Sequence, residues 1–168
     1  MNGVLKLNCS HKDGVHVPQK IGWGGKESVK VREYLLKLED DLMTGGGRWV
    51  ADFTESFWEL PVGATTFDMV ILGNTRPRGF LLSRFFSWIA LPNYPVACFA
   101  YSDDPELKRL TPSLKAIAEY REKEEMAWAW LVVVNEGPFS RRAKAIVESN
   151  DAKEIGIALV DLASQEIT

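Results

Sequence analysis

Cysteine and histidine are scarce in this chain of 168 residues, and each occurs only twice. A disulfide-rich protein needs several paired cysteines, so we do not expect a disulfide framework. No stretch reaches the roughly 18 consecutive apolar residues of a membrane span, and the N-terminus lacks the long apolar core of a secretory signal. We therefore expect a cytoplasmic protein without a membrane partner.

An excess of basic residues is also lacking. The chain has 20 Lys and Arg against 23 Asp and Glu, which gives a formal charge of -3. This balance argues against a uniformly basic nucleic-acid-binding protein, although a local basic patch is compatible with it. Apolar residues make up 46% and charged residues 26% of the chain, near the averages of globular proteins, so disorder is not expected. The length favours a single domain over residues 1–168.

The first part of the chain predicts a hairpin and a helix. Two short β-prone runs surround a turn-rich stretch within residues 1–22, which is typical of a hairpin. Apolar residues then recur at helical spacing in residues 26–43, so one face of the expected helix is apolar. Three glycines at positions 45–47 follow, and they favour the left-handed geometry that ends a helix.

The rest of the chain alternates strand and helix patterns. Residues 48–60 and 67–72 predict two adjacent strands, and an apolar insertion at residues 73–95 separates them from a buried strand at 95–101. A helix with Pro105 at its first position, a strand, a second helix and a last strand follow. Their ranges are about 105–126, 130–134, 139–147 and 155–162. Because strands joined through helices are parallel, we expect an α/β fold in which helices flank a central mixed sheet.

This order of elements resembles the core of the PD-(D/E)xK, or restriction-endonuclease-like, superfamily, and the resemblance covers about residues 26–162. Residues 132–143 and 156–162 also look like the last strand, helix and strand of archaeal and bacterial members. In that family an Asp opens one central strand, an acidic residue and a Lys separated by one residue lie on the next, and the leading helix often adds another acid. Together these groups hold a divalent cation that activates water. The resemblance therefore implies a nuclease fold with Mg²⁺ or Mn²⁺ as its cofactor.

Asp68 is the residue that the resemblance assigns to the first Asp of the motif, and hence to the metal. Glu27, at the start of the expected leading helix, matches the helix acid, and Glu55 is a further candidate on the preceding strand. We expect Asp68 to share a metal ion with Glu27 or Glu55 if a site survives, because several carboxylate oxygens are needed to hold such an ion. The alternative is that Asp68 is a strand-end carboxylate that accepts hydrogen bonds from a neighbouring turn.

The second half of the motif is missing from the strand where it belongs. Residues 95–101 contain neither an acidic residue nor a Lys. Glu106 and Lys108 have the right spacing, but they follow Pro105 on an expected helix, where residues two apart face different directions. Lys108 is therefore a catalytic candidate only if the acidic residue and the Lys of the motif have moved from the strand at residues 95–101 to this segment. The resemblance thus implies an incomplete active site.

The apolar insertion combines basic and aromatic residues. Arg76, Arg78 and Arg84 lie beside four large aromatic residues, which are Phe80, Phe85, Phe86 and Trp88. Such a segment either stacks on and neutralises nucleic acid or is buried in a protein interface. Eight large apolar residues fall within residues 79–91, and soluble monomers rarely expose so large an apolar patch. We therefore expect residues 79–91 to form a homo-oligomer interface, with DNA or RNA as an alternative partner of the arginines.

Both histidines lie near the N-terminus. Cys9, His11, Asp13 and His16 provide the donor types that suit zinc, although their spacing matches no standard zinc finger. A metal site and an ordinary polar turn are the two interpretations of this group. Cys98 lies among apolar residues instead, which is typical of a core thiol rather than a reactive nucleophile.

Three functions are compatible with these features. The first is a catalytically degenerate nuclease-fold protein that acts as a nucleic-acid-associated or accessory subunit. The second is a scaffold protein that dimerises through residues 76–91 and has no role with nucleic acid. The third is an active metal-dependent nuclease that uses Asp68 with relocated partners. Salt-sensitive binding of DNA or RNA distinguishes the first function from the second.

Overall fold

The structure is a computed structural model that describes residues 28–45, 51–75 and 94–168. Within these ranges the order of elements is α1 (Val29–Met43), β1 (Asp52–Val62), β2 (Thr65–Asn74), β3 (Pro95–Ser102), α3 (Leu110–Lys123), β4 (Trp128–Asn135), α4 (Arg141–Glu148), β5 (Ile155–Asp161) and β6 (Glu166–Ile167). The strands form one mixed sheet, so the expected α/β class with a central mixed sheet flanked by helices is confirmed. The hairpin expected in residues 1–22 and most of the insertion at 73–95 lie outside the described residues.

The strands follow one another across the sheet in sequence order. β1, β2 and β3 form an antiparallel meander, whereas β3, β4 and β5 are parallel. Parallel neighbours need long connections, and α3 and α4 provide them. β6 is only two residues long and returns antiparallel to β5, so this side of the sheet ends in a short edge strand.

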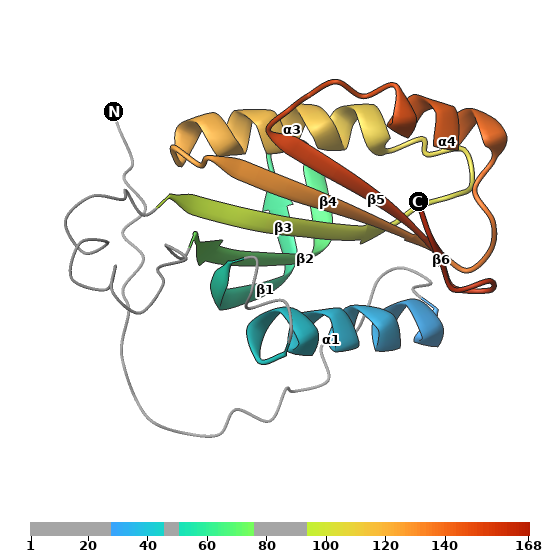
Figure 1. The fold of residues 1–168 in the computed structure, drawn as a ribbon, viewed down its shortest axis with the longest axis horizontal. Helices are drawn as coiled ribbons and strands as arrows, with labels where there is room; N and C mark the ends of the chain where they lie inside the picture. Colours follow the sequence, from blue (N-terminus) through green and yellow to red (C-terminus); the bar gives the residue numbers. More distant parts are fainter. Residues whose placement is uncertain (1–27, 46–50, 76–93) are drawn as a thin grey trace, which may run out of the picture.

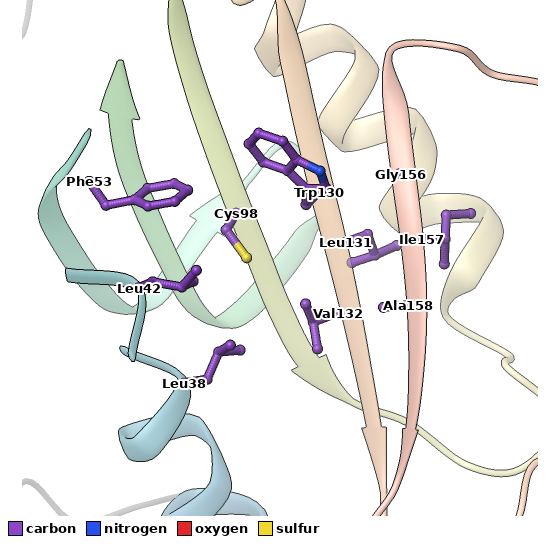
Figure 2. A pocket seen from close by; sticks show the side chains of 10 residues that line it. All are labelled: Leu38, Leu42, Phe53, Cys98, Trp130, Leu131, Val132, Gly156, Ile157 and Ala158. Atoms are coloured by element: carbon purple, nitrogen blue, oxygen red, sulfur yellow. The ribbon is translucent and has the colours of Figure 1, made fainter. Parts of the chain in front are cut away.

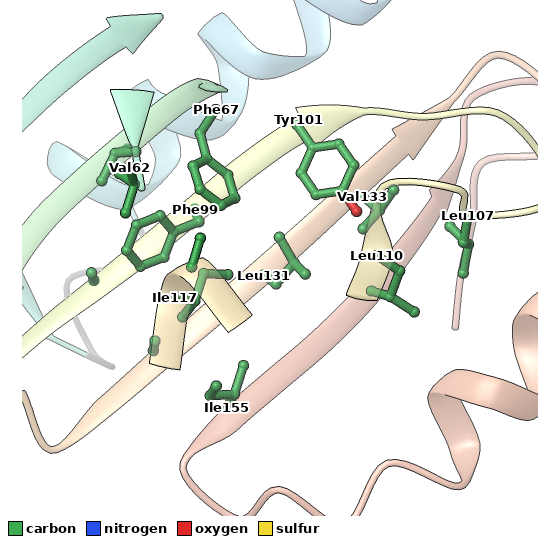
Figure 3. Close-up of a cluster of buried hydrophobic side chains, with 14 of the residues drawn as sticks. Val62, Phe67, Phe99, Tyr101, Leu107, Leu110, Ile117, Leu131, Val133 and Ile155 are labelled. Atoms are coloured by element: carbon green, nitrogen blue, oxygen red, sulfur yellow. The ribbon is translucent and has the colours of Figure 1, made fainter. Parts of the chain in front are cut away.

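Helices cover both faces of the sheet (Figure 1). α3 and α4 lie on one face, where Ile117 belongs to a buried cluster with Phe67 and Phe99 of the strands (Figure 3). α1 lies on the other face, and its Val31 and Leu35 belong to a second buried cluster with residues of β2, β3 and β4. Because both faces carry buried side chains, β3 and β4 are apolar on both sides, as their continuous apolar runs predict.

Candidate functional site

The alternation of side chains between the two faces of the sheet is interrupted in β2 at Asp68. Phe67 belongs to the core on the α3 side of the sheet, whereas Met69 belongs to the core on the α1 side. In a regular strand, residues two apart point to the same face. β2 pairs with β1 on either side of this point, but Glu59, which lies between the paired residues of β1, has a positive φ of 53°. The backbone is therefore irregular at the position of Asp68.

The Asp68 carboxylate joins β2 to the end of β3. Its Oδ2 accepts a hydrogen bond of 2.7 Å from the backbone N–H of Ser102, the last residue of β3. The last backbone pair between these two strands is Met69 with Ala100. The side chain of Asp68 thus extends the contact between β2 and β3 beyond their backbone ladder. The structural interpretation of Asp68 expects a partner in a neighbouring turn, whereas this partner is the backbone N–H at the end of a strand.

Arg109 binds the same strand ends. Its guanidinium donates hydrogen bonds to the carbonyl oxygens of Ser102 at 3.1 Å and Thr66 at 2.6 Å. It also lies 4.6 Å from the centre of the Tyr101 ring, where a cation is attracted to the aromatic face. Burial is the main cause that raises the pKa of Tyr101, so its hydroxyl stays protonated at neutral pH. Together with Asp68, these residues form a junction that holds the ends of β2 and β3 together.

The loop between β3 and α3 is held by its own carboxylates. Asp103 accepts hydrogen bonds from the backbone N–H groups of Asp104 at 2.9 Å and Arg109 at 3.0 Å. Asp104 accepts one from the backbone of Glu106 at 2.9 Å, and its Oδ2 lies 2.7 Å from Nζ of Lys108. The hydrogen bond from Lys108 is the main cause that lowers the pKa of Asp104. Both Asp side chains therefore already have local partners.

The prediction of a helix that begins at Pro105 is wrong for its first residues. α3 begins at Leu110, and Leu107 has a positive φ of 55°, which an α-helix does not contain. The side-chain hydrogen bonds of the loop compete with helical backbone pairing in this stretch. Lys108 consequently lies in a turn, where 77% of its side chain is exposed and its ammonium group pairs with Asp104. Lys108 is therefore neither on a strand nor on a helix.

Glu55 and Asp68 lie apart on the sheet. Glu55 pairs with Leu72, which is four residues along β2 from Asp68. At roughly 3.3 Å per residue, the two backbone positions are separated by about 13 Å. The structure therefore does not bring Glu55 and Asp68 together around one metal ion. Glu27 lies outside the described residues, so its pairing with Asp68 stays a prediction.

A polar hollow of about 280 Å³ lies at the carboxyl ends of β3 and β4. Its polar lining residues are Ser28, Ser102, Asp103, Asp104, Asn135 and Glu136. This end of parallel strands is a common place for ligands in α/β proteins. However, the lining contains three acidic residues and no basic one within the described part of the chain, so it disfavours a phosphate group. Nor do the described residues contain a group of three or more His, Cys, Asp or Glu that could hold a metal ion.

Cys98 is a buried core residue, as its apolar surroundings predict. Its side chain is almost fully buried on the α1 side of the sheet, and burial raises the pKa of its thiol to about 12. The thiolate is the nucleophilic form of cysteine. Cys98 is therefore not a nucleophile at neutral pH.

Several candidate residues of the sequence analysis lie outside the described ranges. They are Arg76, Arg78, Arg84, Phe80, Phe85, Phe86, Trp88, Cys9, His11, Asp13 and His16. Their expected roles stay predictions.

Comparisons with known proteins do not assign a family, because no protein family, curated protein or solved structure matches the chain significantly. Within residues 28–45, 51–75 and 94–168, no helix is long and apolar enough to cross a membrane. The interpretation of the site therefore depends on its own geometry and charge.

Proposed function

We propose that this chain is a restriction-endonuclease-like protein that has lost hydrolytic activity and acts as a nucleic-acid-associated accessory subunit. The order of its elements supports the fold part of this proposal. A leading helix, a meander of three strands, a helix and a further strand parallel to β3 correspond to the superfamily core that the sequence resembles. α4, β5 and β6 then extend that core.

The contact between Asp68 and Ser102 is the observation that carries the loss of catalysis. One carboxylate oxygen of Asp68 already accepts a backbone hydrogen bond of 2.7 Å. A nuclease of this superfamily also needs an acidic residue and a Lys on the neighbouring strand, and β3 supplies neither. Glu55 is about 13 Å away along the sheet, and Lys108 pairs with Asp104. Asp68 therefore serves the fold rather than a metal ion.

A cluster of arginines supports an association with nucleic acid. Arg76, Arg78 and Arg84 fall within nine residues, and residues 76–91 contain no Asp or Glu. Contacts of Arg and Lys with phosphates supply most of non-specific nucleic-acid affinity. The polar hollow at the ends of β3 and β4, with three acidic residues in its described lining, opposes such contacts. Nucleic acid is therefore expected to bind through the arginine cluster and not through this hollow.

Isothermal titration with Mg²⁺ and Mn²⁺ tests the loss of catalysis. We expect the same weak or absent binding for the wild-type chain and for Asp68→Ala, because Asp68 belongs to no group of three or more His, Cys, Asp or Glu that could hold a metal ion within the described ranges. Glu55→Ala is the matched control, since it removes an exposed carboxylate from the neighbouring strand. Metal binding that disappears in Asp68→Ala, together with metal-dependent cleavage of DNA or RNA by the wild type, would support the active nuclease instead.

Replacing Arg76, Arg78 and Arg84 together by Ala tests the association with nucleic acid. Each Arg that neutralises a phosphate contributes about 0.9 to the slope of log K against log salt concentration on duplex DNA. We therefore expect the slope of the triple variant to be shallower than that of the wild type by about 2.7. Fluorescence anisotropy with labelled duplexes, between about 50 and 200 mM salt, measures both slopes.

The matched control removes three exposed basic residues from the described surface, which are Arg141, Arg142 and Lys153. We expect this second triple variant to keep the wild-type slope, because its charges lie outside the cluster of Arg76, Arg78 and Arg84. A wild-type protein that binds neither DNA nor RNA at about 50 mM salt would contradict the nucleic-acid role and favour the scaffold function.

A further inference from the structure

A pocket of about 400 Å³ with both polar and apolar walls lies between α1 and the hairpin formed by β5 and β6. α1 lies on the face of the sheet opposite α3 and α4, and the hairpin forms one edge of the sheet (Figure 1). Sites for small molecules usually measure about 300–1,000 Å³, and a few polar groups in an apolar lining orient the ligand. The pocket has the size of such a site, so its lining indicates which ligand fits.

The apolar part of the lining comes from both sides of the pocket. Its members are Leu38 of α1, Val160 of β5, Leu162 directly after β5, and Ile167 of β6. Val160 and Ile167 lie opposite each other in the antiparallel ladder, so their side chains share one face of the sheet. Val160 is buried, but 66% of Ile167 is exposed. A ligand with an apolar body would remove this exposed surface from water.

Two opposite charges line the pocket from α1. Lys37 and Asp41 are one helical turn apart, so they lie on the same side of the helix. Both are exposed, and neither belongs to an ion pair within the part of the chain that the structure describes. The ammonium group of Lys37 suits a carboxylate of a ligand, and the carboxylate of Asp41 suits an ammonium group. This pair of charges therefore matches a ligand that carries both signs.

Asp161 adds a second carboxylate to the lining, and only 6% of this residue is exposed. Its Oδ1 accepts a hydrogen bond of 2.8 Å from the Ala163 N–H, and its Oδ2 accepts one of 2.7 Å from the Ser164 hydroxyl. An ionised carboxylate can accept about four hydrogen bonds, so Oδ2 keeps a free acceptor position. Among the described residues, Asp161 has no ion-pair partner. An ammonium group in the pocket would provide one.

An apolar groove of about 270 Å³ lies beside α1 as well, and Leu38 lines both spaces (Figure 2). Figure 2 shows Leu38 and Leu42 on one side of the groove and Trp130 on the other. The described lining of the groove contains no charged side chain, so it offers nothing that would orient a polar ligand. The ligand chemistry is therefore specified by the pocket beside the hairpin and not by the groove.

We propose that the pocket between α1 and the β5–β6 hairpin binds a small zwitterion with a large apolar body, which is the chemistry of an aromatic or large aliphatic amino acid. Its carboxylate pairs with Lys37, its ammonium group pairs with Asp41 and Asp161, and its side chain covers Leu162 and Ile167. An anion without an ammonium group would meet two carboxylates, and an amine without a carboxylate would leave Lys37 unpaired. This binding is independent of the nucleic-acid role proposed above.

Titration of the ¹⁵N-labelled full-length chain with L-phenylalanine, followed by NMR, tests the site. We expect saturable shifts of the backbone signals of Lys37, Asp41 and residues 160–167. 3-Phenylpropanoate lacks the ammonium group, and we expect it to bind about tenfold more weakly, because two carboxylates repel it. Phenethylamine lacks the carboxylate, and we expect it to bind about two- to fivefold more weakly, because only the exposed Lys37 loses its partner.

Charge-removing variants assign each contact. Lys37→Gln and Asp41→Asn should each weaken L-phenylalanine binding by about two- to fivefold, since each removes one exposed charge and keeps a side chain of similar shape. Lys37→Gln should leave phenethylamine binding unchanged, because that ligand has no carboxylate. The matched controls are Lys115→Gln and Glu122→Gln on α3, which remove exposed charges on the opposite face of the sheet. Both controls should bind L-phenylalanine as the wild type does.

Three results would overturn the proposal. The first is the absence of saturable shifts with L-phenylalanine, L-tryptophan and L-leucine at tens of millimolar. The second is a set of shifts that lies outside α1 and the β5–β6 hairpin. The third is equal affinity for L-phenylalanine and 3-phenylpropanoate, or unchanged L-phenylalanine binding by both Lys37→Gln and Asp41→Asn, because the charges would then not select the ligand.

Discussion

Asp68→Ala is expected to lower the free energy of unfolding by about 1.5–3 kcal/mol. The Asp68 carboxylate accepts the Ser102 N–H at 2.7 Å, and hydrogen bonds to charged groups stabilise folded proteins more than neutral ones do. Removal of the carboxylate leaves that N–H without its acceptor at the end of β3. It also loosens the junction in which Arg109 binds the Ser102 carbonyl. Urea unfolding followed by circular dichroism measures the change.

Asp68→Asn separates this structural role from metal binding. The amide oxygen of Asn can still accept the hydrogen bond from Ser102, so we expect it to recover more than half of the stability that Asp68→Ala loses. Glu55→Ala, on the exposed side of β1, should change the free energy of unfolding by less than about 0.5 kcal/mol. Equal stability of the wild type and Asp68→Ala would contradict the structural role.

The main elements of the fold follow from local patterns. The apolar spacing that includes Val31 and Leu35 predicts α1, and the structure buries both side chains. The continuous apolar runs of β3 and β4 predict strands buried on two faces, which the structure confirms. These elements could be predicted because the burial of a side chain depends on its own hydrophobicity. The spacing of apolar residues therefore indicates which face of a helix or strand is buried.

The loop before α3 could be predicted only in part. Pro105 after two acidic residues is a common start of a helix, but Asp103 instead accepts the N–H of Arg109, six residues further on. This bond bends the chain so that Leu107, with its positive φ, is buried in the core rather than placed on a helix. An acidic residue can cap either a helix or a turn, and the sequence pattern alone does not distinguish the two outcomes.

The contacts around Asp68 could not be predicted from spacing. Asp68 and Ser102 are 34 residues apart in the chain and meet only because β2 and β3 pair in one register. Arg109 reaches back 43 residues to the Thr66 carbonyl for the same reason. The only available signal was a carboxylate within an apolar strand. That signal correctly marked Asp68 as unusual, but it did not show whether the partner was a metal ion or a backbone N–H.

Gly73→Ala is expected to lower the free energy of unfolding by about 1–3 kcal/mol, because the new methyl group has no space. The pairing of β1 with β2 shifts by one residue between Phe53 and Glu55, and this bulge brings the β1 backbone against Gly73. A Cβ atom at Gly73 would lie 2.6 Å from the Asp52 carbonyl oxygen and 2.7 Å from Cα of Phe53. Backbone atoms cannot turn aside as the end of a flexible side chain can, so β1 itself must move.

Gly137→Ala is the matched control for this prediction, since no atom lies within 4 Å of a Cβ built at Gly137. Urea unfolding of both variants should therefore show a large loss for Gly73→Ala and a change within about 0.5 kcal/mol for Gly137→Ala. Displacement of β1 also moves Phe53, which lines the groove beside α1. Equal stability of the two glycine variants would contradict the close approach of β1 to Gly73.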